Sequence, residues 1–250
     1  MVLAAGLGTR LRPLTDDRPK ALVEVAGRTL LEITLRRLAS FGISDVIVNV
    51  HHYADMVVDY LKKNDNFGMC IEISREEVLL DTGGGLKKAA WFFLQNATSG
   101  HSRRERSFIL HNVDVISSID LQYMTRVHED GKALATLAMQ DRETSRYLLF
   151  DDQNELCGRR AGRDGSTETV RAVAKTHPLA FSGVHVISPR FLSMMSEEGV
   201  FSIITSYLRL AGQREKILAF RADEYYWRDL GKPENISQAA QDIERGLIRL

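Results

Sequence analysis

The residues whose pattern most clearly indicates chemistry lie near the N-terminus, in the string LAAGLGTRLRPLT (residues 3–15). An apolar, strand-like run leads into Gly6 and Gly8, and the basic residues Arg10 and Arg12 follow at once. A Gly-x-Gly turn after a strand presents backbone N–H groups without side-chain bulk, so an anion can approach the chain closely. The string therefore predicts a phosphate-binding turn with positive charge at its rim.

Two common nucleotide-binding motifs do not fit this chain. A dinucleotide-binding GxGxxG would need its third glycine where Leu11 stands, and no GxxxxGK[ST] loop occurs anywhere in the sequence. A dinucleotide-dependent oxidoreductase is therefore disfavoured.

Two later segments could serve the same ligand. Residues 80–86 (LDTGGGL) hold three consecutive glycines, which let the backbone approach a flat base or the edge of a sugar. Lys87 and Lys88 follow on a predicted helix, whose start offers free N–H groups. Residues 108–115 (FILHNVDV) are an apolar strand ending in polar residues, where parallel-sheet enzymes place their sites. The structural alternatives are a helix-capping loop for the first segment and a simple strand cap for the second.

Strand-like and helix-like segments alternate along the first half, which implies βαβ crossovers with helices on both faces of a sheet. The predicted strands are 1–5, 45–50, 69–74, 107–110 and 133–139, and the predicted helices are 28–40, 54–63, 85–94 and 121–129. Residues 142–165 favour hairpins or a mobile loop. Strands follow at 179–187 and 216–220, and helices begin at Pro189 and span 201–211 and 233–250. We expect a Rossmann-like, three-layer α/β/α fold with a mixed, mostly parallel sheet, in one domain spanning 1–250.

The composition bounds the partners. The 250 residues carry 33 Lys+Arg and 33 Asp+Glu, and this zero net charge argues against a nucleic-acid backbone or an acidic membrane as partner. A zero net charge is compatible with a compact anionic ligand. Cys70 and Cys157 are too few for a disulfide framework and lack CxxC spacing. No signal-peptide pattern begins the sequence, so we expect a cytoplasmic protein. The sequence leaves its oligomeric state open between a monomer and a small homo-oligomer.

The N-terminal string resembles the signature of the sugar-1-phosphate nucleotidyltransferases, GxGxRLxPLT followed by Pro-Lys and V-x-V-x-G. The matching residues are Gly6, Gly8, Arg10, Leu11, Pro13, Leu14, Thr15, Pro19, Lys20, Val23, Val25 and Gly27. Three later segments are also similar to family motifs: LDTGGGL, the strand end FILHNVDV, and YWRDLGKPE (residues 226–234). The resemblance covers nearly the whole chain and favours the short members of the family.

The resemblance implies that a sugar phosphate attacks the α-phosphorus of a nucleoside triphosphate and releases pyrophosphate. Charge accumulates on the phosphate oxygens, so fixed cations, hydrogen-bond donors and Mg²⁺ are needed. Arg10 would meet the β- and γ-phosphates and Lys20 the α-phosphate, while Asp114 and Asp229 would hold Mg²⁺. Two carboxylates with phosphate oxygens and water suit this ion.

The resemblance also implies a wider set of contacts. It assigns catalysis to Arg10, Lys20 and Asp114, nucleotide binding to Leu3, Ala4, Ala5, Gly6, Gly8, Thr9, Arg10, Glu76, Thr82, Gly83 and Gly84, and sugar-phosphate binding to Asn112, Gly183 and Asp229. It divides the domain into a nucleotide-binding half, residues 1–140, and a sugar-binding half with the C-terminal helix, residues 141–250.

Two departures from the family pattern motivate a protein of a different class, although the presence of Arg10, Lys20, Asp114 and Asp229 argues against it. Val113 replaces the glycine of the Asn-Gly-Asp strand end, and no Glu-Lys-Pro segment precedes the sugar-side strand. Arg159, Arg160, Arg171 or Lys175 could supply the missing charge. These departures leave open a non-catalytic protein that senses nucleotides or sugar phosphates.

The expected substrates are UTP and N-acetylmuramate 1-phosphate, because the chain is short and its second glycine segment reads TGGG. That pair would place the chain in NDP-sugar biosynthesis and peptidoglycan recycling. GTP with mannose 1-phosphate is the alternative. Neighbouring His51 and His52 would point to opposite faces of a strand, and His111 has no partner at ligand spacing, so we interpret all three as structural or substrate-adjacent.

Overall fold

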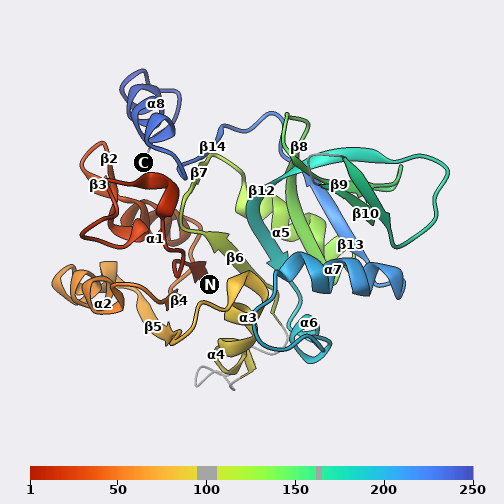
Figure 1. Ribbon diagram of the computed structural model, residues 1–250, viewed down its shortest axis with the longest axis horizontal. Coiled ribbons are helices and arrows are strands. Elements are labelled where there is room, and N and C mark those ends of the chain that lie inside the picture. The colour runs from red at the N-terminus through yellow and green to blue at the C-terminus, as the bar shows by residue number, and fades with distance from the viewer. Residues whose placement is uncertain (95–105, 162–164, 250) are drawn as a thin grey trace. The chain divides into compact units, whose positions relative to one another are not determined.

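The computed structural model describes residues 1–94, 106–161 and 165–249 (Figure 1). Internal contacts divide the chain into two compact units. The first comprises Met1–Asp81, His111–Ile119 and Tyr225–Leu250, and the second comprises Thr82–Leu110 and Asp120–Glu224. The units therefore do not follow the sequence halves 1–140 and 141–250, whose separate binding roles stay a prediction.

The first unit is built on parallel strands in the order β6-β1-β4-β5. These are β1 (Val2–Leu3), β4 (Asp45–Val50), β5 (Cys70–Arg75) and the last two residues of β6 (Phe108–Asn112). The helices are α1 (Leu30–Ser40), α2 (Ala54–Lys63) and α8 (Pro233–Glu244), with short 3-10 turns η1 (Thr9–Leu11), η2 (Lys20–Leu22) and η3 (Asp65–Gly68). Two small antiparallel pairs complete the unit: β2 (Glu24–Val25) with β3 (Arg28–Thr29), and β7 (Val115–Ser117) with β14 (Trp227–Asp229).

Local chemistry accounts for these elements. Helix α1 begins after Thr29, whose hydroxyl accepts a hydrogen bond from the backbone N–H of Glu32 at 3.1 Å. It buries Leu31 and Leu35 on one face, as helical spacing requires. Strand β4 is buried from Val46 onward because parallel strands are covered on both faces.

The second unit is mostly antiparallel, in the strand order β11-β10-β9-β12-β8, with β13 parallel to β8. Its strands are β8 (Ala135–Gln140), β9 (Arg146–Phe150), β10 (Leu156–Ala161), β11 (Ser166–Thr169), β12 (His177–Ile187) and β13 (Ile217–Arg221). Its helices are α3 (Asp81–Lys88), α4 (Ala90–Leu94), α5 (Leu121–Asp130), α6 (Arg190–Ser193) and α7 (Ile203–Gly212). The first residue of α3, Asp81, belongs to the first unit. The largest buried side chains include Phe150, Phe191 and Tyr207.

The α/β class with a mixed sheet is confirmed. Strand β4 and helix α2 have the predicted bounds. Within the segment 142–165, strands β9 and β10 form a hairpin, which was one of the two expected outcomes, and residues 162–164 lie outside the described residues. The helix predicted at 85–94 is wrong at its start and in its continuity: α3 already begins at Asp81, and Ala89 separates it from α4. Helix α8 ends at Glu244. Over the described residues, the helices are too short or too polar to cross a membrane.

Candidate functional site

The glycine turn after β1 is held by its own backbone and by the segment that returns beneath it. Gly8 has φ +67°, in the left-handed region that glycine adopts freely. Its carbonyl accepts a hydrogen bond from the Thr15 hydroxyl at 2.9 Å. A Cβ at Gly8 would lie 2.9 Å from Thr15 Cγ2 and 3.1 Å from Lys20 Cβ. The glycine is therefore needed both for its conformation and for close packing of the turn against Lys20.

Lys20 and Asp114 form an ion pair through Nζ and Oδ2. Lys20 begins η2 directly after Pro19, and Asp114 lies in the turn between β6 and β7. The two side chains are only 11% and 16% exposed, so the pair is largely shielded from water. The structure thus brings together two groups that lie 94 residues apart in sequence.

Asp229 lies beside Asp114 because β14 pairs with β7. In that ladder Asp229 is opposite Val115, and the N–H of Leu230 donates to the carbonyl of Asp114 at 2.7 Å. The Asp229 carboxylate accepts from the N–H of Gly231 at 2.6 Å, and Asn235 Nδ2 donates to the Asp229 carbonyl at 2.7 Å.

Gly231 marks where Asp229 and Arg10 converge. A Cβ at Gly231 would lie 2.6 Å from Asp229 Oδ1 and 2.7 Å from Arg10 Nη2. All four charged groups predicted to act on phosphate or metal belong to the first unit.

Asn49 supports the end of β1, and the sequence analysis missed it. Its Oδ1 accepts from the N–H of Ala4 at 2.7 Å, and its Nδ2 donates to Glu76 Oε1 at 2.6 Å. Glu76 Oε2 in turn accepts from the N–H of Leu80 at 2.9 Å. Asn49 and Glu76 are both buried. The signal in the sequence was a lone amide inside the apolar strand DVIVNV, since a buried polar group needs partners.

The end of β6 lies against β1 and carries a buried histidine. Asn112 is opposite Leu3 in the ladder, and the N–H of Val113 donates to the Leu3 carbonyl at 3.1 Å. Val113 is buried. His111 is fully buried, and this desolvation lowers its pKa to about 4, so it is neutral at pH 7. Its Nδ1 contacts the Asn112 carbonyl at 2.8 Å, which favours the Nδ1–H tautomer.

The predicted contacts Thr82, Gly83 and Gly84 lie in α3 of the second unit, where they pack against the chain before α7. Thr82 Oγ1 accepts from the N–H of Ile203 at 3.0 Å, and the N–H groups of Gly83 and Gly84 point to the Phe201 carbonyl at 2.9 and 3.3 Å. A Cβ at Gly83 would lie 2.4 Å from the Phe201 ring. Close packing accounts for the glycines, and their contact with nucleotide stays a prediction.

Gly183, also in the second unit, has φ +78° in β12, where the register with β8 shifts between Phe181 and His185. Only glycine adopts this backbone without strain. Its role in sugar-phosphate binding stays a prediction.

Comparison with known proteins agrees with this geometry. The sequence profile of the nucleotidyl transferase family matches residues 1–153. The N-acetylmuramate α-1-phosphate uridylyltransferase of Caulobacter vibrioides is 34% identical over 94% of this chain and 92% of its own. The chain belongs to the nucleotidyl transferase family. A mannose-1-phosphate guanyltransferase of Yarrowia lipolytica is 28% identical, and its alignment spans 94% of this chain but only 61% of the relative.

Solved structures show the same fold as this nucleotidyltransferase. HddC from Yersinia pseudotuberculosis superposes with a TM-score of 0.73 at 21% identity and covers 97% of each chain. A UDP-glucose pyrophosphorylase gives a TM-score of 0.73 at 16% identity, with 99% of this chain and 98% of the other covered. At these identities the likeness concerns the fold alone.

The family typically uses Mg²⁺, and the carboxylates of this nucleotidyltransferase fit that ion. Within the described residues there is no group of three or more His, Cys, Asp or Glu side chains that could form a protein-only metal site. Asp114 and Asp229 come from paired strand ends, and Asp114 already holds a cation, the Lys20 ammonium. Two carboxylates completed by substrate oxygens and water are the donor set that Mg²⁺ accepts.

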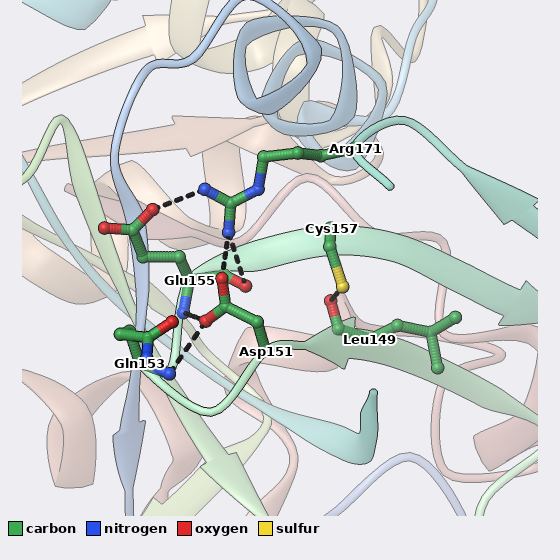
Figure 2. A network of polar contacts seen from close by, with 6 residues as sticks. All are labelled: Leu149, Asp151, Gln153, Glu155, Cys157 and Arg171. Atoms are coloured by element: carbon green, nitrogen blue, oxygen red, sulfur yellow. Dashed lines mark hydrogen bonds and ion pairs between the residues drawn. The ribbon is translucent and has the colours of Figure 1, made fainter. Parts of the chain in front are cut away.

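The four basic candidates for the sugar phosphate differ in whether they already pair with carboxylates, and Figure 2 shows the pairs of Arg171. Arg171 pairs with Asp151 and Glu155, and Arg159 pairs with Glu168 at 2.7 Å. The Arg160 guanidinium lies 4.7 Å from the Tyr147 ring centroid, and Lys175 is exposed. Within the described part of the chain, only Arg160 and Lys175 of these four form no ion pair with a carboxylate.

Proposed function

We propose that this nucleotidyltransferase joins a nucleoside triphosphate to a sugar 1-phosphate and releases pyrophosphate, with UTP and N-acetylmuramate 1-phosphate as its substrates. The observation that carries the proposal is the meeting of Lys20, Asp114, Asp229 and Arg10 beside the glycine turn. The substrate pair rests on the uridylyltransferase of Caulobacter vibrioides, which is 34% identical along nearly the full length of both chains. The product would enter peptidoglycan recycling.

The reaction needs charge stabilisation more than proton transfer. An anionic oxygen of the sugar phosphate forms a new bond to the α-phosphorus, and the bond from that phosphorus to the bridging oxygen of the pyrophosphate breaks. The electron pair leaves with pyrophosphate, and no base is needed because the attacking oxygen is already an anion. Positioning and fixed positive charge therefore carry most of the catalysis.

The chain supplies these charges from rigid positions. The backbone at Gly6 and Gly8 would receive the phosphates, Arg10 would bind the departing pyrophosphate through its planar fork, and Lys20 would act as a point charge at the α-phosphate. Mg²⁺ held by Asp114 and Asp229 would neutralise phosphate charge as a Lewis acid. Asn49 and Glu76 hold the strand end that carries the turn.

GTP with mannose 1-phosphate is the second candidate, and it rests on the guanyltransferase similarity. That similarity is 28% and covers 61% of the relative, so we rank it below the uridylyltransferase pair. A non-catalytic sensor of the same ligands remains the alternative of another class, motivated by Val113 at the strand end.

The experiment is a pyrophosphate-release assay with UTP, GTP, CTP and dTTP against N-acetylmuramate, mannose, glucose and N-acetylglucosamine 1-phosphates, in Mg²⁺. We expect UTP with N-acetylmuramate 1-phosphate to give the highest kcat/KM. A higher value for GTP with mannose 1-phosphate would replace the proposed pair. If none of the pairs reacts while the same ligands raise the melting temperature, the protein is a sensor.

A further inference from the structure

A carboxylate predicted to hold a divalent cation already holds a monovalent one. Lys20 Nζ contacts Asp114 through Oδ2, and both side chains are largely buried. A metal ion that bound Asp114 through Oδ2 would need the oxygen that Lys20 contacts. The ammonium and the metal therefore compete for Asp114, because two cations cannot share one oxygen at contact distance without strong repulsion.

The two backbones on either side of this pair are fixed. The Lys20 carbonyl accepts from the N–H of Val23 at 3.0 Å within η2, and the stem of Lys20 begins against the turn at Gly8. The Asp114 carbonyl accepts from Leu230 at 2.7 Å. Separation of the pair thus requires only rotation of the four-carbon lysine stem, which is flexible.

The four charged groups predicted to act at this site balance one another without a ligand. Arg10 and Lys20 contribute two positive charges, and Asp114 and Asp229 contribute two negative charges. A free divalent cation meets no net attraction there and must displace an ammonium ion from a shielded carboxylate. A nucleoside triphosphate changes this balance because its phosphates offer Lys20 a new partner and bring negative charge for the metal.

We propose that Lys20 is a displaceable counter-ion that closes the metal site in the free protein. It occupies Asp114 until a polyphosphate draws its ammonium group away, so that the divalent cation binds together with the nucleotide and not before it. The inference rests on the proposed function, since it takes Asp114 as a metal ligand and the nucleotide as the arriving anion.

The test is a titration of the free protein with Mn²⁺, without nucleotide or sugar, in which electron paramagnetic resonance measures unbound Mn²⁺. We expect Lys20→Met to bind Mn²⁺ at least about tenfold more tightly than the wild type, which corresponds to about 1.4 kcal/mol. Lys20→Gln is the second uncharged variant in case the first does not fold. Lys20→Arg keeps the charge and should keep the weak binding of the wild type.

Two further variants locate the effect. Lys87→Met removes a lysine that pairs with Glu198 at 2.6 Å in the second unit, and it should leave Mn²⁺ binding unchanged. Asp114→Asn added to Lys20→Met should abolish the gain. Equal Mn²⁺ affinity in Lys20→Met, Lys20→Gln and the wild type would overturn the inference. Failure of the proposed function would instead show as a gain in Mn²⁺ affinity without pyrophosphate release for any substrate pair.

Discussion

The two units use buried ion pairs in different ways. In the second unit Arg171 binds the carboxylates of Asp151 and Glu155, and Asp151 also accepts the N–H groups of Gln153 and Glu155, both at 2.9 Å (Figure 2). In the first unit, the Asp114 carboxylate has Lys20 as its one ion-pair partner among the described residues, and Asp229 lies on the paired strand. A carboxylate that accepts hydrogen bonds from the backbone of its own turn as well as an ion pair stabilises the fold. A carboxylate with one flexible partner can instead exchange that partner for a ligand.

The buried histidines of the two units also differ in how many of their ring nitrogens have a hydrogen-bond partner. Burial lowers the pKa of both His111 and His128 to about 4. His128 in the second unit has a partner for each ring nitrogen, Thr136 Oγ1 and Ser188 Oγ, both at 3.0 Å. His111 in the first unit leaves Nε2 without a partner among the described residues. Both ring nitrogens of His128 are therefore paired, whereas His111 keeps one ring nitrogen unpaired among the described residues.

The largest expected effect that tests this difference between the units is a loss of activity when Asp114 is replaced. Asp114→Asn removes the charge that binds the metal and should lower kcat/KM at least about a thousandfold, as loss of a principal electrostatic contact does. The free energy of unfolding should fall by about 1–2 kcal/mol, because the pair is largely buried but the flexible Lys20 stem can carry its ammonium group to water once the carboxylate is gone. Pyrophosphate-release rates and urea denaturation of the same sample measure both. If Asp114→Asn kept more than a tenth of the wild-type activity, Asp114 would not be part of the catalytic site.

The same substitution in the second unit should have the opposite profile. Asp151→Asn leaves the buried Arg171 short of a carboxylate and should lower the free energy of unfolding by about 2–3 kcal/mol, with kcat/KM little changed. Glu168→Gln, which breaks the exposed pair with Arg159, is the control and should cost less than about 1 kcal/mol. A large loss of activity without loss of stability in Asp151→Asn would contradict the contrast between the units.

A smaller effect is expected at Gly231. Gly231→Ala places a methyl group against Asp229 Oδ1 and Arg10 Nη2, at 2.6 and 2.7 Å before relaxation, and should lower kcat about tenfold to a hundredfold by displacing them. Gly212→Ala is the control, since its nearest atom is the Val170 carbonyl oxygen at 3.3 Å. Equal kcat in both variants would show that the position of Arg10 and Asp229 is not critical.

The smallest effect concerns pH. His128 has a pKa of about 4 when folded, against an ordinary value of 6.5, because burial disfavours its charged form. The unfolded chain therefore takes up the proton first, and the stability that neutral His128 preserves above pH 6.5 is lost as pH falls toward 4. Between pH 7 and pH 5 we expect a loss of about 2 kcal/mol from this residue. His128→Gln should show a shallower fall in urea denaturation, and an unchanged slope would contradict the assignment.

The sequence was sufficient for features that depend on local pattern. The strand at 45–50, the helix at 54–63 and the glycine turn were all predicted, because the residue pattern that determines each of them lies within a few residues. The resemblance, in turn, named Arg10, Lys20, Asp114 and Asp229, and the structure places all four in one unit.

The features that could not be predicted from the sequence depend on contacts between distant segments. The pairing of β7 with β14, which sets Asp229 beside Asp114, joins segments more than 100 residues apart. Helix α3 begins among glycines of low helix propensity because Phe201 packs against Gly83. Likewise, Asn49 is a partner of Ala4 and Glu76 only once three segments meet.

The most direct measurement of the central claim uses Mn²⁺ as a paramagnetic probe. In the amide NMR spectrum of the protein with UTP and Mn²⁺, nearby bound metal broadens signals most strongly. We predict the strongest broadening at the residues next to Asp114 and Asp229, and its loss in Asp114→Asn. Strongest broadening at Asp151 and Glu155 would contradict the account, because the metal would then lie in the unit whose carboxylates are already enclosed.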